Sequence, residues 1–288
     1  MNSFNIKRFG QTFRWVLATN FRNFLAWTLG AAVGVFLLEM LLIAFNVRPD
    51  GGNYIHELRY NISPICSIAL LIFVLVALST GFAAYLKKPQ REAFLMLPST
   101  NLEKFLASVI YVTVVWTLAG FLAFVLGDTL RMVVRALAYG NEWYSLVPRV
   151  LDMIFSKISP GTTGNMLVVT TSYKVTWIIF FVSSLFWIHS LYILGGTLMR
   201  KYSFVVASLA GILFMMLYVW VGLKLNLSGF YTETLPNSAL VYHKVGAIGY
   251  ALCVLFPLLS IFNYWASFHI FKGFQLITNK WTNYDFFK

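Results

Sequence analysis

The sequence has 288 residues, of which 59% are hydrophobic and only 11% are charged. Soluble domains carry roughly 25% charged residues, so water is excluded as the main solvent of this chain. The formal charge is +12, but the 22 basic residues are scattered between apolar segments. This scatter argues against nucleic acid as a partner and fits contact with anionic lipid headgroups.

Residues 3–22 carry aromatic and aliphatic side chains at helical spacing, with basic residues on the other side. We expect an amphipathic elbow helix that lies on the inner membrane surface. The alternatives are an early extension of the first span or a frayed tail. No signal-peptidase site follows the first apolar run, so that run is expected to act as a permanent signal anchor.

The apolar runs are long enough for about six helices that cross a hydrocarbon core of about 30 Å. They cover approximately residues 24–45, 64–86, 105–127, 175–198, 203–223 and 245–270. No polar module separates them, so we expect one transmembrane domain over 1–288 in an all-α, polytopic membrane protein. With both termini inside, 13 of the 22 Lys and Arg residues fall in inner segments, which favours that orientation.

The outer segment 128–170 is too long to lack structure in a compact protein. Apolar residues over 130–137 and 143–154 predict two short helices that rest at the outer interface. Such helices can form a packing lid or a substrate gate, and the sequence does not separate these roles.

Glu39 lies in the first apolar span, where a charged carboxylate costs roughly 2.5 to 3.5 kcal/mol near the bilayer centre. By depth, Lys174 at the outer start of the fourth span is the expected cation. A structural pair and a role in substrate or proton passage both explain such a residue. His189 is interpreted as a hydrogen-bonded core histidine, with a ligand or relay role as the alternative.

Three further features concern helix packing. Gly30 and Gly34 form a G-x-x-x-G motif, which lets helices approach closely within one protomer or across a dimer. Pro257 predicts a kink in the sixth span, near Asn263, which can bond across helices; gating and packing both explain a kink. The two cysteines lie inside apolar runs and are expected to be core residues, not disulfide or zinc ligands.

The segment between the second and third spans carries the functional argument. Pro89 suits the first turn of a helix and Pro98 stops helix at the residue before it, so a short inner helix is predicted over 89–97, with Phe94 and Leu97 on one face. Thr100 and the glutamate three residues later then match a capping box at the start of the third span.

This segment resembles the inner loop of permease subunits of ABC-2 type (type V) exporters, which often reads R-E-x-x-x-x-L-P-x-[ST]-x-x-E-x-x-x-K. The matching residues are Arg91, Glu92, Leu97, Pro98, Thr100 and Glu103, with Lys104 directly after the last of them. The resemblance implies that 89–97, with Phe94, is a coupling helix that docks into a separate ATP-binding subunit. It also implies export by alternating access across the cell inner membrane, by a homodimer or heterodimer of permeases.

No motif in the sequence indicates chemistry of its own. A G-x-x-x-x-G-K-[ST] phosphate loop is missing, so ATPase activity is expected from a partner chain. The four histidines have no H-E-x-x-H spacing and no G-x-S-x-G elbow occurs, so no catalytic, cofactor or metal site is expected. The alternatives to an exporter subunit are a non-transport scaffold or assembly factor, and a secondary transporter.

Overall fold

The computed structural model describes residues 4–45, 54–81, 88–139, 143–156, 167–168, 171–199, 201–225, 229–234 and 241–273. Among these residues, six helices are long and apolar enough to cross a membrane: Ile6–Phe45, Tyr60–Thr80, Asn101–Ala138, Thr171–Leu198, Ser203–Lys224 and Ala247–Lys272. The prediction of an all-α, polytopic membrane protein is confirmed. Contacts divide the chain into two compact units, Met1–Ile154 and Phe155–Lys288, where no boundary was predicted.

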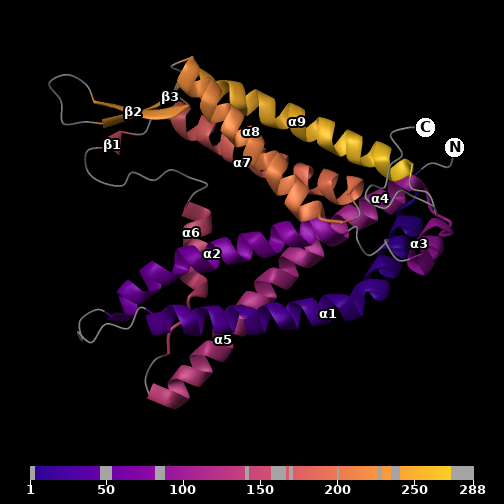
Figure 1. Cartoon of the computed structure of the whole chain (residues 1–288), viewed down its shortest axis with the longest axis horizontal. Coiled ribbons are helices and arrows are strands. Elements are labelled where there is room, and N and C mark those ends of the chain that lie inside the picture. Colours follow the sequence, from indigo (N-terminus) through magenta and orange to yellow (C-terminus); the bar gives the residue numbers. More distant parts are fainter. Residues whose placement is uncertain are drawn as a thin grey trace. The chain divides into compact units, whose positions relative to one another are not determined.

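The first unit contains the predicted coupling segment, which lies beside the N-terminal part of the first helix (Figure 1). The helices of this unit are α1 (Ile6–Phe45), α2 (Tyr54–Thr80), α3 (Lys88–Leu95), α4 (Asn101–Ile110), the π-helical segment η2 (Tyr111–Val115), α5 (Trp116–Tyr139) and α6 (Val147–Ser156). Helix α1 packs against α4 and α5, and α2 packs against α5. One core cluster joins α1, α2, α5 and α6 around Ile43, Ile62 and Phe124.

Helix α1 is one continuous helix of 40 residues, so the N-terminal segment is not a separate elbow helix. At 1.5 Å per residue this length is about twice the thickness of a hydrocarbon core. Figure 1 shows that the N-terminal part of α1 bends away from the rest. Thr12 and Asn20 each donate a side-chain hydrogen bond to the carbonyl four residues earlier, at 2.9 Å, an interaction that often bends helices.

Helical structure also continues without a break from α4 through η2 into α5. The third span therefore runs on to Tyr139, and residues 130–137 do not form the separate short helix that the sequence pattern predicts. Helix α6 corresponds to the second short helix predicted there. Residues 157–166 and 169–170 of the outer segment, like 82–86 of the second predicted span, lie outside the described residues.

The second unit is built from α7 (Thr171–Leu198), α8 (Ser203–Lys224) and α9 (Ala247–Lys272), with α7 packed against both other helices. Its core includes Trp187 and Phe256, whose rings stack with centroids 5.0 Å apart. The sequence analysis did not predict the small sheet in this unit, of order β1-β3-β2. Its strands are β1 (Leu167–Val168), β2 (Phe230–Thr234) and β3 (Val241–Val245), with β3 parallel to β1 and antiparallel to β2.

Candidate functional site

Helix α3 confirms the short helix predicted between the second and third spans. It begins at Lys88 and ends at Leu95, two residues earlier than the predicted end. Pro89 lies in the first turn, where backbone N–H groups have no partner within the helix, so the N–H that proline lacks costs no hydrogen bond. Pro98 disfavours helical backbone at the preceding residue, which explains the early end.

The capping box that starts α4 is confirmed in both of its hydrogen bonds. The hydroxyl oxygen of Thr100 accepts from the backbone N–H of Glu103 at 3.2 Å, and the Oε2 atom of Glu103 accepts from the backbone N–H of Thr100 at 2.8 Å. Two amide donors at the helix start are thereby satisfied. The third span therefore has a fixed starting point immediately after α3.

The second oxygen of Glu103 binds the N-terminal end of α1. Its Oε1 atom accepts from the backbone N–H of Asn5 at 2.8 Å and from Nη2 of Arg8 at 3.0 Å. The Glu103 side chain is fully buried, and that of Arg8 is 29% exposed. One carboxylate thus joins the start of α4 to the start of α1. The sequence analysis missed this ion pair, because nothing local signals a contact across 95 positions.

The inward side of α3 is fixed by Lys104 and by aromatic packing. The Lys104 ammonium donates to the carbonyl oxygen of Leu95 at 2.8 Å, which satisfies an acceptor at the C-terminal end of α3. The same ammonium lies 5.9 Å from the centroid of the Phe94 ring. On its other side the Phe94 ring packs against Trp15 of α1, with centroids 5.8 Å apart. Phe94 is consequently 1% exposed.

A different set of side chains faces outward. Pro89, Ala93 and Met96 are exposed, and they follow one another at spacings of four and three residues along one face of the helix. The N–H of Met96 still bonds to the carbonyl of Glu92 at 3.0 Å, so this residue continues the helical path. Met96 is 84% exposed. These three residues are called the docking strip below.

The predicted coupling residues therefore divide into two groups. Four of them are buried, namely Arg91, Phe94, Glu103 and Lys104, and of these Phe94 and Lys104 hold α3 in place. Thr100 caps α4, Glu92 and Leu97 are half-buried, and Pro98 is exposed. Phe94 and Leu97 were predicted to share one face, but Phe94 is not available to a partner because Trp15 covers its ring. Met96 was missed, although its helical spacing from Pro89 and Ala93 is visible in the sequence.

Glu39 does have a buried cation partner, but this partner is Arg131 of α5 and not Lys174. Arg131 Nε donates to Glu39 Oε2 at 2.8 Å, and Arg131 Nη2 donates to Asp128 Oδ1 at 2.5 Å. All three side chains are at most 2% exposed. Lys174 was expected to be the partner by depth, whereas the continuation of α5 brings Arg131 to the end of α1.

This buried cluster also fixes the segment that leads into α6. Arg131 Nη2 donates to the carbonyl of Tyr144 at 2.6 Å, and its guanidinium lies 4.5 Å from the centroid of the Tyr144 ring. Asp128 Oδ2 accepts from the Ser145 hydroxyl at 2.6 Å and from the backbone N–H of Leu146 at 3.1 Å. Among the described residues, this cluster contains two carboxyl groups and one guanidinium group. Two of its buried atoms, Glu39 Oε1 and Arg131 Nη1, make no hydrogen bond.

In the second unit, the polar side chains predicted in the spans bond between α7 and α9. His189 Nδ1 lies 2.5 Å from the Tyr264 hydroxyl, and the Asn263 amide donates to Ser190 Oγ at 3.1 Å. These contacts agree with a hydrogen-bonded core histidine and with an asparagine that bonds across helices. Helix α9 continues on both sides of Pro257 as one helix.

Gly30 and Gly34 do not mediate helix packing inside the first unit. A Cβ atom added at either residue meets no described atom within 4 Å. Among the described residues, close packing within the first unit therefore does not explain the G-x-x-x-G motif. Packing against a second copy stays a prediction.

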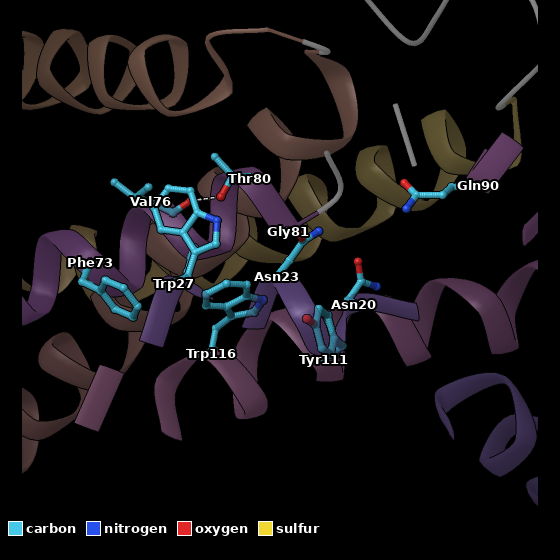
Figure 2. A pocket seen from close by; sticks show the side chains of 11 residues that line it. Asn20, Asn23, Trp27, Phe73, Val76, Thr80, Gly81, Gln90, Tyr111 and Trp116 are labelled. Carbon is cyan, nitrogen blue, oxygen red and sulfur yellow. Dashed lines mark hydrogen bonds between the residues drawn. The ribbon is translucent and has the colours of Figure 1, made fainter. Parts of the chain in front are cut away.

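Figure 2 shows a cavity in the first unit, of about 230 Å³, between α1, α2, α3 and η2. Trp116 of α5 also lines it, and the ring centroids of Trp27, Phe73 and Tyr111 lie between 6.3 and 6.4 Å from that of Trp116. Asparagine and glutamine amides supply most of the polar lining, including Gln90 of α3. The sequence analysis did not predict this cavity, whose walls come from four separate segments.

Comparisons with protein-family models, curated proteins and solved structures gave no match. Within the part of the chain that the structure describes, no group of three or more His, Cys, Asp or Glu residues can hold a metal ion. Two features of the first unit therefore carry the functional argument, namely the rigidly held α3 and the aromatic cavity beside it.

Proposed function

We propose that this chain is the membrane-spanning permease subunit of an ATP-driven exporter of the ABC-2 type. In this proposal α3 is the coupling helix, and it docks into a separate ATP-binding subunit on the cytoplasmic side. Six spans make half of a transporter of this kind, so a second permease chain, identical or related, completes it. Both termini then lie in the cytoplasm.

The observation that carries the proposal is the contrast between the two faces of α3. Its inner face is fixed by the packing of Phe94 on Trp15 and by the bond from Lys104, while the docking strip leaves Met96 84% exposed. A helix held in this way can pass a displacement to the elements that hold it. An exposed apolar strip on a short helix also suits insertion into a groove of a partner protein.

The connections of α3 supply a mechanical route. A push on α3 reaches α4 through the bond between Lys104 and the carbonyl of Leu95, and it reaches α1 through Phe94 and Trp15. Since α4 continues through η2 into α5, the push is carried along one helical rod that ends at Tyr139. Nucleotide-driven closure of the partner would rock these spans and so alternate access.

The proposal is tested by co-purification in mild detergent with the variant Met96→Asp. Leu137→Asp is the matched control, because Leu137 is also 84% exposed and lies near the other end of the same helical rod. Wild type and the control should retain a soluble ATP-binding protein at equal stoichiometry with ATPase activity, and Met96→Asp should lose both. If no ATP-binding protein accompanies the wild type, the scaffold or assembly-factor alternative replaces the exporter.

The cytoplasmic position of α3 is tested separately by cysteine labelling. Met96→Cys and Leu137→Cys are placed in a background in which Cys66 and Cys253 are alanine. A membrane-impermeant maleimide should label position 96 only in inside-out vesicles and position 137 only in right-side-out vesicles. The reverse pattern would contradict the proposal, because a cytoplasmic partner could not reach α3.

A further inference from the structure

The aromatic cavity continues into a second space on the surface of the first unit. A shallow groove of about 430 Å³ is lined by Ala26, Trp27, Gly30, Ala31 and Phe73. Trp27 and Phe73 line the cavity as well, so the two spaces share a wall. The groove carries only apolar side chains and glycine, whereas the cavity carries amides and hydroxyls. A polar compartment thus adjoins an apolar one.

The cavity has the chemistry of a site for an uncharged polar group. Its described lining contains no Asp, Glu, Lys, Arg or His side chain, so no counter-charge is present for an ionic headgroup. Asn20, Asn23 and Gln90 can each donate and accept hydrogen bonds. The volume of about 230 Å³ is below the roughly 300 Å³ at which pockets for drug-sized molecules begin, and it suits a small headgroup.

The buried donors favour a ligand that carries oxygen over a quaternary ammonium. The Tyr111 hydroxyl and the Trp116 indole N–H are both buried; they interact with one another, but neither forms a hydrogen bond of ordinary geometry. Figure 2 shows the two groups turned toward one another beside the cavity. The indole N–H can only donate, and a ligand oxygen would give it a better placed acceptor than the Tyr111 hydroxyl, whereas a trimethylammonium group has no acceptor to offer. A hydroxyl or carbonyl oxygen can supply one.

The backbone at this position is also unusual. Tyr111 opens the π-helical segment η2, and Trp116 follows directly after it. Short π segments inside α-helices are rare and occur frequently at functional sites. Here the segment places both aromatic side chains at the wall of one cavity.

We infer that these adjoining spaces bind an uncharged amphiphile, with its hydroxyl-bearing headgroup in the cavity and its hydrocarbon chain in the groove beside Gly30. The wide opening at Gly30 is what leaves room for the chain, since no described atom lies within 4 Å of a Cβ added there. Binding of this kind does not depend on the exporter proposal. The amphiphile can be a lipid of the bilayer or a transported compound.

The test uses the full chain in detergent and a monoacylglycerol that carries a diazirine in its acyl chain. Photolabelling followed by peptide mass spectrometry should place the label on peptides that contain Trp27 or Phe73. Unlabelled monoacylglycerol should compete, whereas an anionic lysophosphatidylglycerol and an alkyltrimethylammonium should compete at least about tenfold less well. A resident lipid would co-purify and be seen by native mass spectrometry, and a transported compound would bind only when added.

Two matched pairs of variants sharpen the test. Gly30→Leu should reduce labelling by about tenfold because its side chain fills the groove, whereas Gly34→Leu, equally open but outside the groove, should not. Tyr111→Phe should weaken binding about fivefold through the loss of one hydrogen bond, whereas Tyr144→Phe, a tyrosine that is also 3% exposed, should not.

Labelling of wild type that is not saturable, or that falls outside both spaces, would overturn the inference. Equal labelling of the two glycine variants would do the same, and so would stronger competition by either charged amphiphile. The position of the label in wild type requires no variant to fold, so the inference is testable even if a substitution prevents folding.

Discussion

Replacing Arg131 by methionine should strongly destabilise the first unit. The change removes hydrogen bonds from Arg131 to Glu39, to Asp128 and to the carbonyl of Tyr144, and it leaves two carboxylates buried without a cation. Removal of one partner from a buried ion pair costs about 3 to 5 kcal/mol. Methionine has a similar volume and no polar atom that could replace the guanidinium, so the loss is electrostatic.

The two carboxylates should respond differently to neutralisation. Glu39 accepts from Arg131 through one oxygen while its other oxygen makes no bond, so glutamine keeps the acceptor and removes the surplus negative charge. We expect Glu39→Gln to cost less than about 1 kcal/mol. Both oxygens of Asp128 accept, from Arg131, Ser145 and Leu146. Asp128→Asn turns an amide donor toward one of these donors and should cost about 2 to 4 kcal/mol.

Thermal unfolding in one detergent measures all of these variants. Arg149→Met is the matched control, since Arg149 pairs with Asp152 at 3.8 Å on the surface, where such pairs contribute about 0 to 1 kcal/mol. Wild type, Glu39→Gln and Arg149→Met should have the highest and nearly equal melting temperatures. Asp128→Asn should have a lower melting temperature, and Arg131→Met the lowest. The reasoning would be refuted if Glu39→Gln and Asp128→Asn lowered the melting temperature equally. It would also be refuted if Arg131→Met lowered it no more than Arg149→Met.

Three further substitutions test other contacts. Glu103→Gln should cost about 2 kcal/mol and speed hydrogen exchange in the first turns of α1, because the carboxylate charge is lost and the amide nitrogen faces either the N–H of Asn5 or that of Thr100. Lys104→Met keeps the apolar stem but removes the bond at the end of α3, so exchange in α3 should rise about fivefold while exchange in α6 stays constant. Tyr264→Phe removes the hydroxyl beside His189 and should lower the stability of the second unit by about 1 kcal/mol; no change in melting temperature would contradict this.

Features that depend on neighbouring residues could be predicted from the sequence. The capping box needs only Thr100 and Glu103, three positions apart, and the proline positions limit α3 from both sides. The spans follow from apolar runs that no soluble fold could expose. In each case the physical cause of the element lies within one helical turn or one uninterrupted segment, so the existence of the element could be predicted, although the end of the third span could not.

The partner of Glu39 could not be predicted in the same way. The need for a cation follows from the cost of a charge in hydrocarbon, and this expectation is confirmed. Arg131 and Asp128, however, fall in the segment predicted to lie beyond the third span, because charged residues normally end an apolar run. Since Arg131 pairs both with Asp128 and with Glu39, α5 continues through these charged residues. Pairing across 92 positions leaves no local trace.

The face of α3 that points outward could not be predicted from the sequence for a related reason. The helix has apolar side chains on more than one face, and periodicity cannot tell which face meets the protein. Trp15 and Lys104 decide this by covering Phe94, and Met96 is left outside. The aromatic cavity could not be predicted either, because its walls come from separate segments that include α1, α2, α3 and η2. The π-helical segment had no signal in the apolar pattern either.

The docking strip and the cavity are connected through α3. Gln90 lines the cavity and directly follows Pro89 of the docking strip, and Met96 lies less than two turns further on. A rigid helix of eight residues cannot move at one end without moving at the other. If the exporter proposal and the amphiphile site are both correct, partner binding and amphiphile binding must be coupled. Linkage then requires that each changes the affinity of the other by the same factor. Measuring monoacylglycerol affinity with and without the ATP-binding partner, and partner affinity with and without monoacylglycerol, should give equal ratios that differ from one. Ratios of one would separate the two sites, and Gln90 would then be only a wall of the cavity.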